Sequence, residues 1–297
     1  MQSNKSERIG WYFYDFANSA FYTTVITVFL GPYLTTLAKN TADPNGYINI
    51  LGLNISAGSY FPYIVSLSVF LQIFLLPYAG SLADYTNMKK QILGFFAYLG
   101  AFSTMGLYFL DESNLLLGGL LFIIANLSFG ISAVMYNAYL NDIADNEKKD
   151  TVSSIGWAFG YMGGGIILGA NLFLYSNAAS FGISESIAIR ISMCSAGLWW
   201  AIFTIIPMFT LKIRQPKQRI KTGEKLTIIG FKQLISILKE IRKYPKTLLF
   251  LIAYLLYNDG VHTIIVISSA FGQEELGLSS GFLTKLILMI QFVAFFG

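Results

Sequence analysis

Formal charge is scarce in this 297-residue chain. Asp, Glu, Lys and Arg make up 12% of it, whereas 55% of its residues are hydrophobic. A soluble globular domain carries about 25% charged residues. The shortage of charge, together with a mean hydropathy of +0.58, argues against a soluble protein and favours a chain whose main solvent is lipid.

Cysteine and histidine are also nearly absent. Because Cys194 is the single cysteine, no internal disulfide can form, and because His262 is the single histidine, no multi-histidine metal centre can be built. The sequence has no recognisable Ser/His/Asp arrangement and no phosphate-binding glycine loop with its lysine. These shortages predict that the protein is not an enzyme and uses neither a cofactor nor a metal.

Long apolar runs are the main feature that the sequence does have. A membrane-spanning helix needs about 20 predominantly apolar residues. Seven runs meet that need, at residues 10–37, 60–83, 92–110, 115–140, 152–175, 191–211 and 247–271. An eighth run, at residues 281–297, is shorter and still apolar where the sequence ends. We therefore predict an all-α, multi-pass integral membrane protein whose first partner is the lipid bilayer.

The positions of the basic residues predict the orientation in the membrane. If the N-terminus is cytoplasmic, all of the 20 basic residues except Lys39, Arg190 and Lys285 fall in cytoplasmic segments. Loops rich in Lys and Arg stay on the cytoplasmic side. The same rule explains the net charge of +4, so the basic residues do not predict a nucleic-acid partner.

One long basic segment separates the sixth apolar run from the seventh. Residues 212–225 are polar and basic, and residues 226–243 carry apolar side chains at near-helical spacing, which is typical of an amphipathic helix on a membrane surface. We therefore predict three parts. These are a six-helix half at residues 1–211, a cytoplasmic linker at 212–246, and the start of a second half at 247–297, with two helices of which the second is incomplete.

Two carboxylates lie inside apolar runs. Asp15 is the only charged residue in the run 10–37, and Asp259 is the only one in the run 247–271. A charge in contact with lipid is costly, so such residues usually face a bundle interior or a water-filled path. Asp15 could bind a coupling ion, a proton or a substrate amine. Alternatively, polar neighbours near the inner interface simply cap it.

Asp259 and His262 are three residues apart, which places them on one face of a helix. An acid and a histidine within reach of each other could relay protons. They could also form a hydrogen-bonded pair that holds helices together. The sequence leaves both interpretations open.

A short repeat links the first and seventh runs. The first contains Tyr14-Asp15 and the seventh contains Tyr257-Asn258-Asp259. Internal repeats are common in secondary transporters, whose sites lie between the repeats. The amides Asn18, Asn137 and Asn258 are polar groups within or at the ends of runs, where they either line a pathway or bond helices to one another.

The loop after the second apolar run carries the most specific motif. It reads Gly80-Ser81-Leu82-Ala83-Asp84-Tyr85-Thr86-Asn87-Met88-Lys89-Lys90. This resembles the signature loop of the major facilitator superfamily, although Tyr85 replaces the usual basic residue and Asn87 replaces the second glycine. The resemblance implies that Gly80, Asp84, Lys89 and Lys90 belong to a loop that gates the cytoplasmic side.

Four further segments narrow the resemblance. They are residues 11–21, 136–140, 156–164 and 257–261. Together they are similar to the vacuole-effluxer family within that superfamily, including its bacterial members. The resemblance implies a twelve-helix transporter, efflux of amino acids in the vacuolar members, and a proton as the coupling ion. A chain of this length would then end about four helices short, as a fragment or a truncated product.

The sequence thus predicts a major facilitator fold with one six-helix bundle and the first two helices of a second. The expected function is secondary active transport of small metabolites by alternating access, in a bacterial inner membrane with a cytoplasmic N-terminus. The alternatives are transport of another solute, such as a sugar or drug, and a non-transporting scaffold or inactive fragment.

Overall fold

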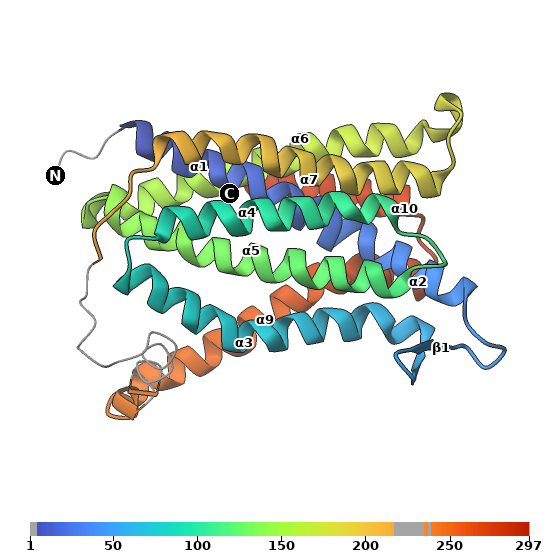
Figure 1. The fold of residues 1–297 in the computed structure, drawn as a ribbon, viewed down its shortest axis with the longest axis horizontal. Coiled ribbons are helices and arrows are strands. Elements are labelled where there is room, and N and C mark those ends of the chain that lie inside the picture. The colour runs from blue at the N-terminus through green and yellow to red at the C-terminus, as the bar shows by residue number, and fades with distance from the viewer. Residues whose placement is uncertain (1–4, 217–234, 237–238, 297) are drawn as a thin grey trace.

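The computed structural model describes residues 5–216, 235–236 and 239–296 and is almost wholly helical there (Figure 1). Seven of its helical segments are long and apolar enough to cross a membrane: Lys5–Asn40, Ala57–Tyr85, Lys89–Phe109, Leu115–Ile143, Asn146–Ser176, Glu185–Thr210 and Pro245–Glu274. The shorter helix α10 covers Ser280–Phe296. The expected all-α membrane fold is thereby confirmed. The predicted linker helix at residues 226–243 lies mostly outside the described residues.

Most spans consist of one long helix, in places preceded or followed by a short 3-10 turn. The long helices are α3 (Tyr60–Tyr85), α4 (Lys89–Gly106), α5 (Leu115–Ile143), α6 (Lys149–Ser176), α7 (Glu185–Thr210) and α9 (Pro245–Glu274). The turns are η2 (Ala57–Ser59), η3 (Leu107–Phe109), η4 (Asn146–Lys148) and η5 (Ala178–Phe181).

Span one differs from the other spans because it changes helix type midway. It runs without a break through α1 (Lys5–Ala20), the π-helical segment η1 (Phe21–Phe29) and α2 (Leu30–Asn40). The π-helix is rare and frequently occurs at functional sites. Span one is also the most deeply buried of the seven, so the unusual segment lies at the centre of the molecule.

A small β-hairpin follows span one. Strand β1 (Tyr47–Ile50) pairs antiparallel with β2 (Leu53–Ser56), with Ile50 opposite Leu53. The two residues between the strands, Leu51 and Gly52, both have positive φ, at 53° and 84°. Positive φ at both central residues is the requirement of the two-residue turn that best matches strand twist. The sequence analysis did not predict this hairpin.

The helices run between two faces of the molecule. The amino face holds the beginnings of α1, α4, α6 and α9 and the ends of α3, α5 and α7, and the opposite hairpin face carries the β-hairpin (Figure 1). At the hairpin face, the last part of α9 contacts α2 and η1. At the amino face, the first part of α9 lies apart from the other spans (Figure 1) and is exposed from Leu249 to Tyr257. The two ends of α9 therefore differ in how closely they approach span one.

Glycines on α6 allow it to lie directly against α1. A Cβ added at Gly163 would lie 2.3 Å from the Phe16 carbonyl oxygen, and one added at Gly156 would lie 2.4 Å from the Trp11 ring. Small residues at helix contacts let two backbones approach closely in a membrane. This contact fixes where the polar side chains of α1 lie.

Replacing Gly163 with alanine should force α6 away from α1, because the new Cβ would overlap a backbone oxygen that cannot turn aside. Overpacking of this kind costs about 1–3 kcal/mol. We expect a lower thermal unfolding midpoint for the purified protein. Gly260→Ala is the matched control, since Gly260 is also helical and has no neighbouring atom within 4 Å of its Cβ position. Equal midpoints for the two variants would contradict the tight contact.

Candidate functional site

Asp15 lies where α1 meets α6. The Gly160 Cβ position is 2.7 Å from Asp15 Oδ2 and 2.9 Å from the Ser19 hydroxyl oxygen, so the bare glycine backbone borders both polar groups. Within the described part of the chain, no hydrogen bond or ion pair is recorded for the Asp15 carboxylate. A partly buried carboxylate therefore lies in the first span without a partner from these helices.

Aromatic side chains surround this carboxylate. Tyr14 and Tyr136 lie near Asp15, and their rings are 5.4 Å apart. The Trp11 ring stacks on Tyr136 at 4.2 Å, and its indole N–H donates to the Tyr136 carbonyl oxygen at 2.8 Å. These contacts join α1 to α5. They hold the rings rigidly beside Asp15, and the buried Asn18 lies close to the Tyr14 hydroxyl.

About two turns beyond Asp15 along span one, Tyr22 reaches α9. Its hydroxyl lies 3.3 Å from Nδ1 of His262. This hydrogen bond joins two residues 240 positions apart in the sequence. The contact brings the predicted pathway residue His262 against span one, the span that also carries Asp15.

The other predicted pathway residues do not gather around Asp15. Asn137 on α5 and Asp259 on α9 are exposed, and Asn258 is half-buried. The hydrogen bond of His262 is to Tyr22, and no bond between His262 and Asp259 is recorded among the described residues. Roles for Asn137, Asn258 and Asp259 stay predictions.

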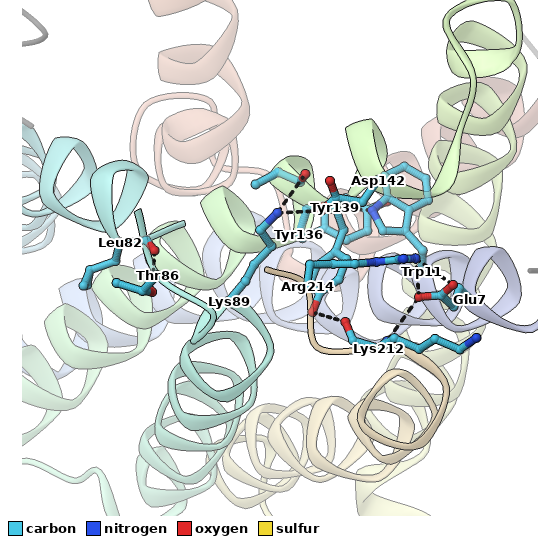
Figure 2. Close-up of polar contacts among 11 residues, drawn as sticks. Glu7, Trp11, Leu82, Thr86, Lys89, Tyr136, Tyr139, Asp142, Lys212 and Arg214 are labelled. Atoms are coloured by element: carbon cyan, nitrogen blue, oxygen red, sulfur yellow. Dashed lines mark hydrogen bonds and ion pairs between the residues drawn. The ribbon is translucent and has the colours of Figure 1, made fainter. Parts of the chain in front are cut away.

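A cluster of charges lies at the amino face (Figure 2). Lys89 Nζ pairs with Asp142 Oδ2 at 2.6 Å, and the two side chains are only 6% and 9% exposed. The same ammonium lies 5.1 Å from the centre of the Tyr139 ring and 3.4 Å from the Ala138 carbonyl oxygen. The first turn of α4 is thus bonded to the last turns of α5.

A second ion pair continues the cluster. The Arg214 guanidinium donates to both carboxylate oxygens of Glu7 at 2.8 Å, and the Glu7 side chain is 3% exposed. The Lys212 N–H also donates to Glu7, and the Tyr139 hydroxyl donates to the Lys212 carbonyl oxygen (Figure 2). The chain that leaves α7 is therefore attached to the beginning of α1 and to α5.

The predicted gating loop divides between this cluster and the surface. Lys89 is buried in the ion pair with Asp142, whereas Lys90 and Asp84 are half-buried, and no ion pair is recorded for either among the described residues. Gly80 has open space around its Cβ position. Lys89 therefore holds α4 to α5, and the gating role of Gly80, Asp84 and Lys90 stays a prediction.

Sequence reasoning missed several residues of these clusters. Arg214 was counted only among the cytoplasmic basic residues, and Glu7, Asp142 and Tyr22 were not considered. The signal that could have found Glu7 and Asp142 is the unusual placement of an acid next to an apolar run, on the same side as many basic residues. Tyr22 offers no comparable signal, because one aromatic residue among many gives no hint of its partner.

Long apolar helices packed around a deeply buried first span define a multi-pass helical membrane protein. The comparison of sequences is more specific. The model of the family described as vacuole effluxer Atg22-like matches residues 3–297. The chain therefore belongs to this family of major facilitator-type transporters.

Individual relatives agree with the family. The chain is 34% identical over 289 residues to an uncharacterized MFS-type transporter, YxiO, of Bacillus subtilis, covering 96% of this chain and 64% of the relative. It is 26% identical to Autophagy-related protein 22 of Yarrowia lipolytica, covering 85% of this chain and 55% of that protein. The corresponding protein of Pyricularia oryzae is 25% identical, with 92% and 53% covered. The chain thus spans less than two thirds of the length of these relatives.

Removing one partner of the Lys89–Asp142 pair should destabilise the amino face strongly. Asp142→Leu leaves a buried ammonium without its counter-ion, and losing one partner of a buried pair costs about 3–5 kcal/mol. We expect the double variant Lys89→Met/Asp142→Leu to recover most of the loss in the free energy of unfolding. Lys90→Met is the control, because Lys90 is the next residue and lacks a recorded ion pair among the described residues. Additive losses in the double variant would contradict the pairing.

Proposed function

We propose that the chain works as part of a secondary active transporter that moves small metabolites across the membrane by alternating access. Its membership of a transporter family and its many spanning helices support this proposal. Helices α9 and α10 are proposed to begin a second half, joined to the first six spans by the segment 212–246. The amino face is proposed to lie in the cytoplasm, as the distribution of basic residues favours, in a bacterial inner membrane.

The observation that carries the proposal is the unpartnered carboxylate of Asp15. A charge taken out of water without a partner costs several kcal/mol, and we propose that the partly buried carboxylate is neutralised by a particle that does not come from the described helices. A proton or a cation from solution meets that need. Coupled transport requires a group that binds and releases such a particle, and an ionisable residue inside a membrane span is by default a candidate for that role.

We propose that the carboxylate is reached from solution past α9. At the amino face, the first part of α9 is exposed and lies apart from the other spans. At the hairpin face, α9 lies against η1 and α2. Solute and protons would therefore reach the region of Asp15 from the amino face in this conformation, and from the hairpin face in the alternate one.

The finer proposal is proton-coupled efflux, with amino acids as the first substrates to test. Membership of the effluxer family supports efflux as the direction of transport, and the Asp15 carboxylate supports coupling to protons. His262, held by Tyr22, is proposed to line the same route, as are Tyr14 and Asn18. Transport of a sugar or a drug is the alternative. A panel of amino acids, sugars and drugs distinguishes it from amino-acid transport.

Asp15→Asn should abolish the coupling of solute transport to protons, because a side-chain amide does not bind and release a proton near neutral pH. We would reconstitute the protein in liposomes and measure the accumulation of radiolabelled amino acids driven by a pH gradient. The accumulation ratio should fall to about one, its value without coupling free energy, while exchange of labelled for unlabelled solute persists.

Asp150→Asn is the matched control, since Asp150 is exposed at the beginning of α6. Its accumulation ratio should equal that of the parent protein. Full accumulation by Asp15→Asn would refute the coupling role. Absence of flux for every amino acid, sugar and drug of the panel would instead favour a scaffold.

A further inference from the structure

The β-hairpin between spans one and two has an apolar side and a polar side. Successive side chains of a strand point to opposite sides, so the pairing register sorts the paired residues into two sets. The aliphatic residues form the apolar side: Ile48, Ile50, Leu53 and Ile55. The polar side is formed by Tyr47, Asn49, Asn54 and Ser56. The hairpin is therefore amphipathic.

The protein covers only part of the apolar side. Near the base of the hairpin, Ile48 is 4% exposed and belongs to the buried core, and its strand contacts α2. Near the tip, Leu53 is 67% exposed, and Leu51 in the turn is 82% exposed. The apolar surface thus continues beyond the helices that cover its base.

Leu51 is an unfavourable residue for this turn. Its φ is 53°, and a bulky residue with positive φ is uncommon, whereas Asn, Asp and Gly are preferred at the centre of such turns. Other residues hold the turn, because the Asn49 Oδ1 accepts the Gly52 N–H at 3.1 Å and its Nδ2 donates to Asn54 Oδ1 at 3.0 Å. A leucine here is unfavourable in backbone conformation and in exposure to water. Apolar surroundings would remove the second cost.

Formal charge is absent from the hairpin and from the span that follows it. The last charged residue before the hairpin is Asp43, whose Oδ1 accepts the Tyr47 N–H at 2.8 Å, and the next charged residue is Asp84. Other elements carry charge at the hairpin face, where Lys39 of α2 pairs with Glu274 of α9. Burying a charge is costly, so an uncharged hairpin can enter apolar surroundings at little electrostatic cost.

The hairpin is continuous with a span that faces lipid. Strand β2 ends at Ser56, and span two begins at Ala57. Little of span two is buried inside the protein, and the hairpin lies beside the beginning of α3 (Figure 1). A strand rises about 3.4 Å per residue, which places the tip within about 14 Å of the beginning of the span. The tip is therefore within reach of the bilayer surface that span two enters.

We propose that the hairpin is an interfacial anchor whose tip residues Leu51 and Leu53 insert into the lipid leaflet at the hairpin face. The polar side, with Asn49 and Asn54, remains toward the headgroups and water. Lipid is the occupant because the apolar side of the hairpin leads directly into a lipid-facing span. The anchor attaches the connection between spans one and two to the membrane surface. Because the hairpin is uncharged, neither anionic lipid nor salt should alter its insertion.

The test measures the depth of single nitroxide spin labels in a Cys194→Ser background. Labels are placed at Leu53 on the apolar side and at the adjacent Asn54 on the polar side; both residues are exposed. The full chain is studied in nanodiscs of phosphatidylcholine, after each labelled protein has been shown to be monodisperse with the parent helix content. Collisions of each label with oxygen, which concentrates among lipid chains, are compared with its collisions with a water-soluble nickel chelate.

The label at Leu53 should collide more with oxygen, and the label at Asn54 should collide more with the chelate. The logarithm of the collision ratio should therefore have opposite signs at the two positions. Replacing part of the phosphatidylcholine with phosphatidylglycerol, or raising the salt concentration, should leave both ratios unchanged.

Leu51→Asn separates membrane insertion from the stability of the turn. Asparagine tolerates positive φ better than leucine, so the turn itself should be retained, but the inserting side chain is lost. We expect the label at Leu53 to lose its preference for oxygen. Leu51→Met is the matched control, because it keeps an apolar side chain and should keep the preference.

Three outcomes would overturn the anchor. Preference for the chelate at both labelled positions would show that the tip lies in water. Shielding of the Leu53 label from both reagents would show that protein, such as a second copy of this chain, covers the tip. An unchanged ratio in Leu51→Asn would show that Leu51 does not hold the tip in the membrane.

Discussion

The close approach of α1 and α6 is the constraint on which the rest of the site depends. Gly163 brings the α6 backbone against the Phe16 carbonyl, and one turn earlier Gly160 faces Asp15. Because residue 160 is a glycine, it has no side chain that could donate to the carboxylate. At this point the close packing of the two helices therefore gives Asp15 no side-chain partner on α6. A larger residue at position 160 would fill the space that the carboxylate uses.

The spans could be predicted from the sequence because length and hydropathy decide them. The hairpin and the π-helical segment could not, for different reasons. Strands of four residues carry too little alternation to be recognised. The π-helical register of η1 depends on hydrogen bonds between residues five apart, and Pro32 is compatible with several ways of relieving a missing N–H. Hydrophobicity contains no information on that choice.

The same distinction applies to the site. Asp15 was recognisable because a charge within an apolar run is expensive wherever the run packs. Glu7 and Arg214 were not, because the sequence places both at the same membrane side yet separates them by 207 positions. Many basic residues compete for Glu7 on that side, and only the path of the chain after α7 selects Arg214. Partners of charges at span ends depend on tertiary structure, whereas the presence of an isolated charge does not.

The two faces differ in the strength of their polar contacts, and this difference bears on which parts can move. At the amino face, the pairs Lys89–Asp142 and Glu7–Arg214 join α1, α4, α5 and the end of α7, and three of the four side chains are less than a tenth exposed. Breaking such a pair costs about 3–5 kcal/mol, whereas the exposed Lys39–Glu274 pair contributes about 0–1 kcal/mol.

Separation should therefore occur where the contacts are weak. The spans joined by buried pairs would keep their arrangement, and α9 would change its position relative to span one. The aromatic contacts of Trp11 and Tyr136 reinforce the first group, since they lie between α1 and α5. Asp15 lies inside that group, against α6, and would keep its surroundings while access to it changes. Under the proposed function, the binding group would lie in a unit that keeps its arrangement, and movement of a neighbouring helix would change access to it.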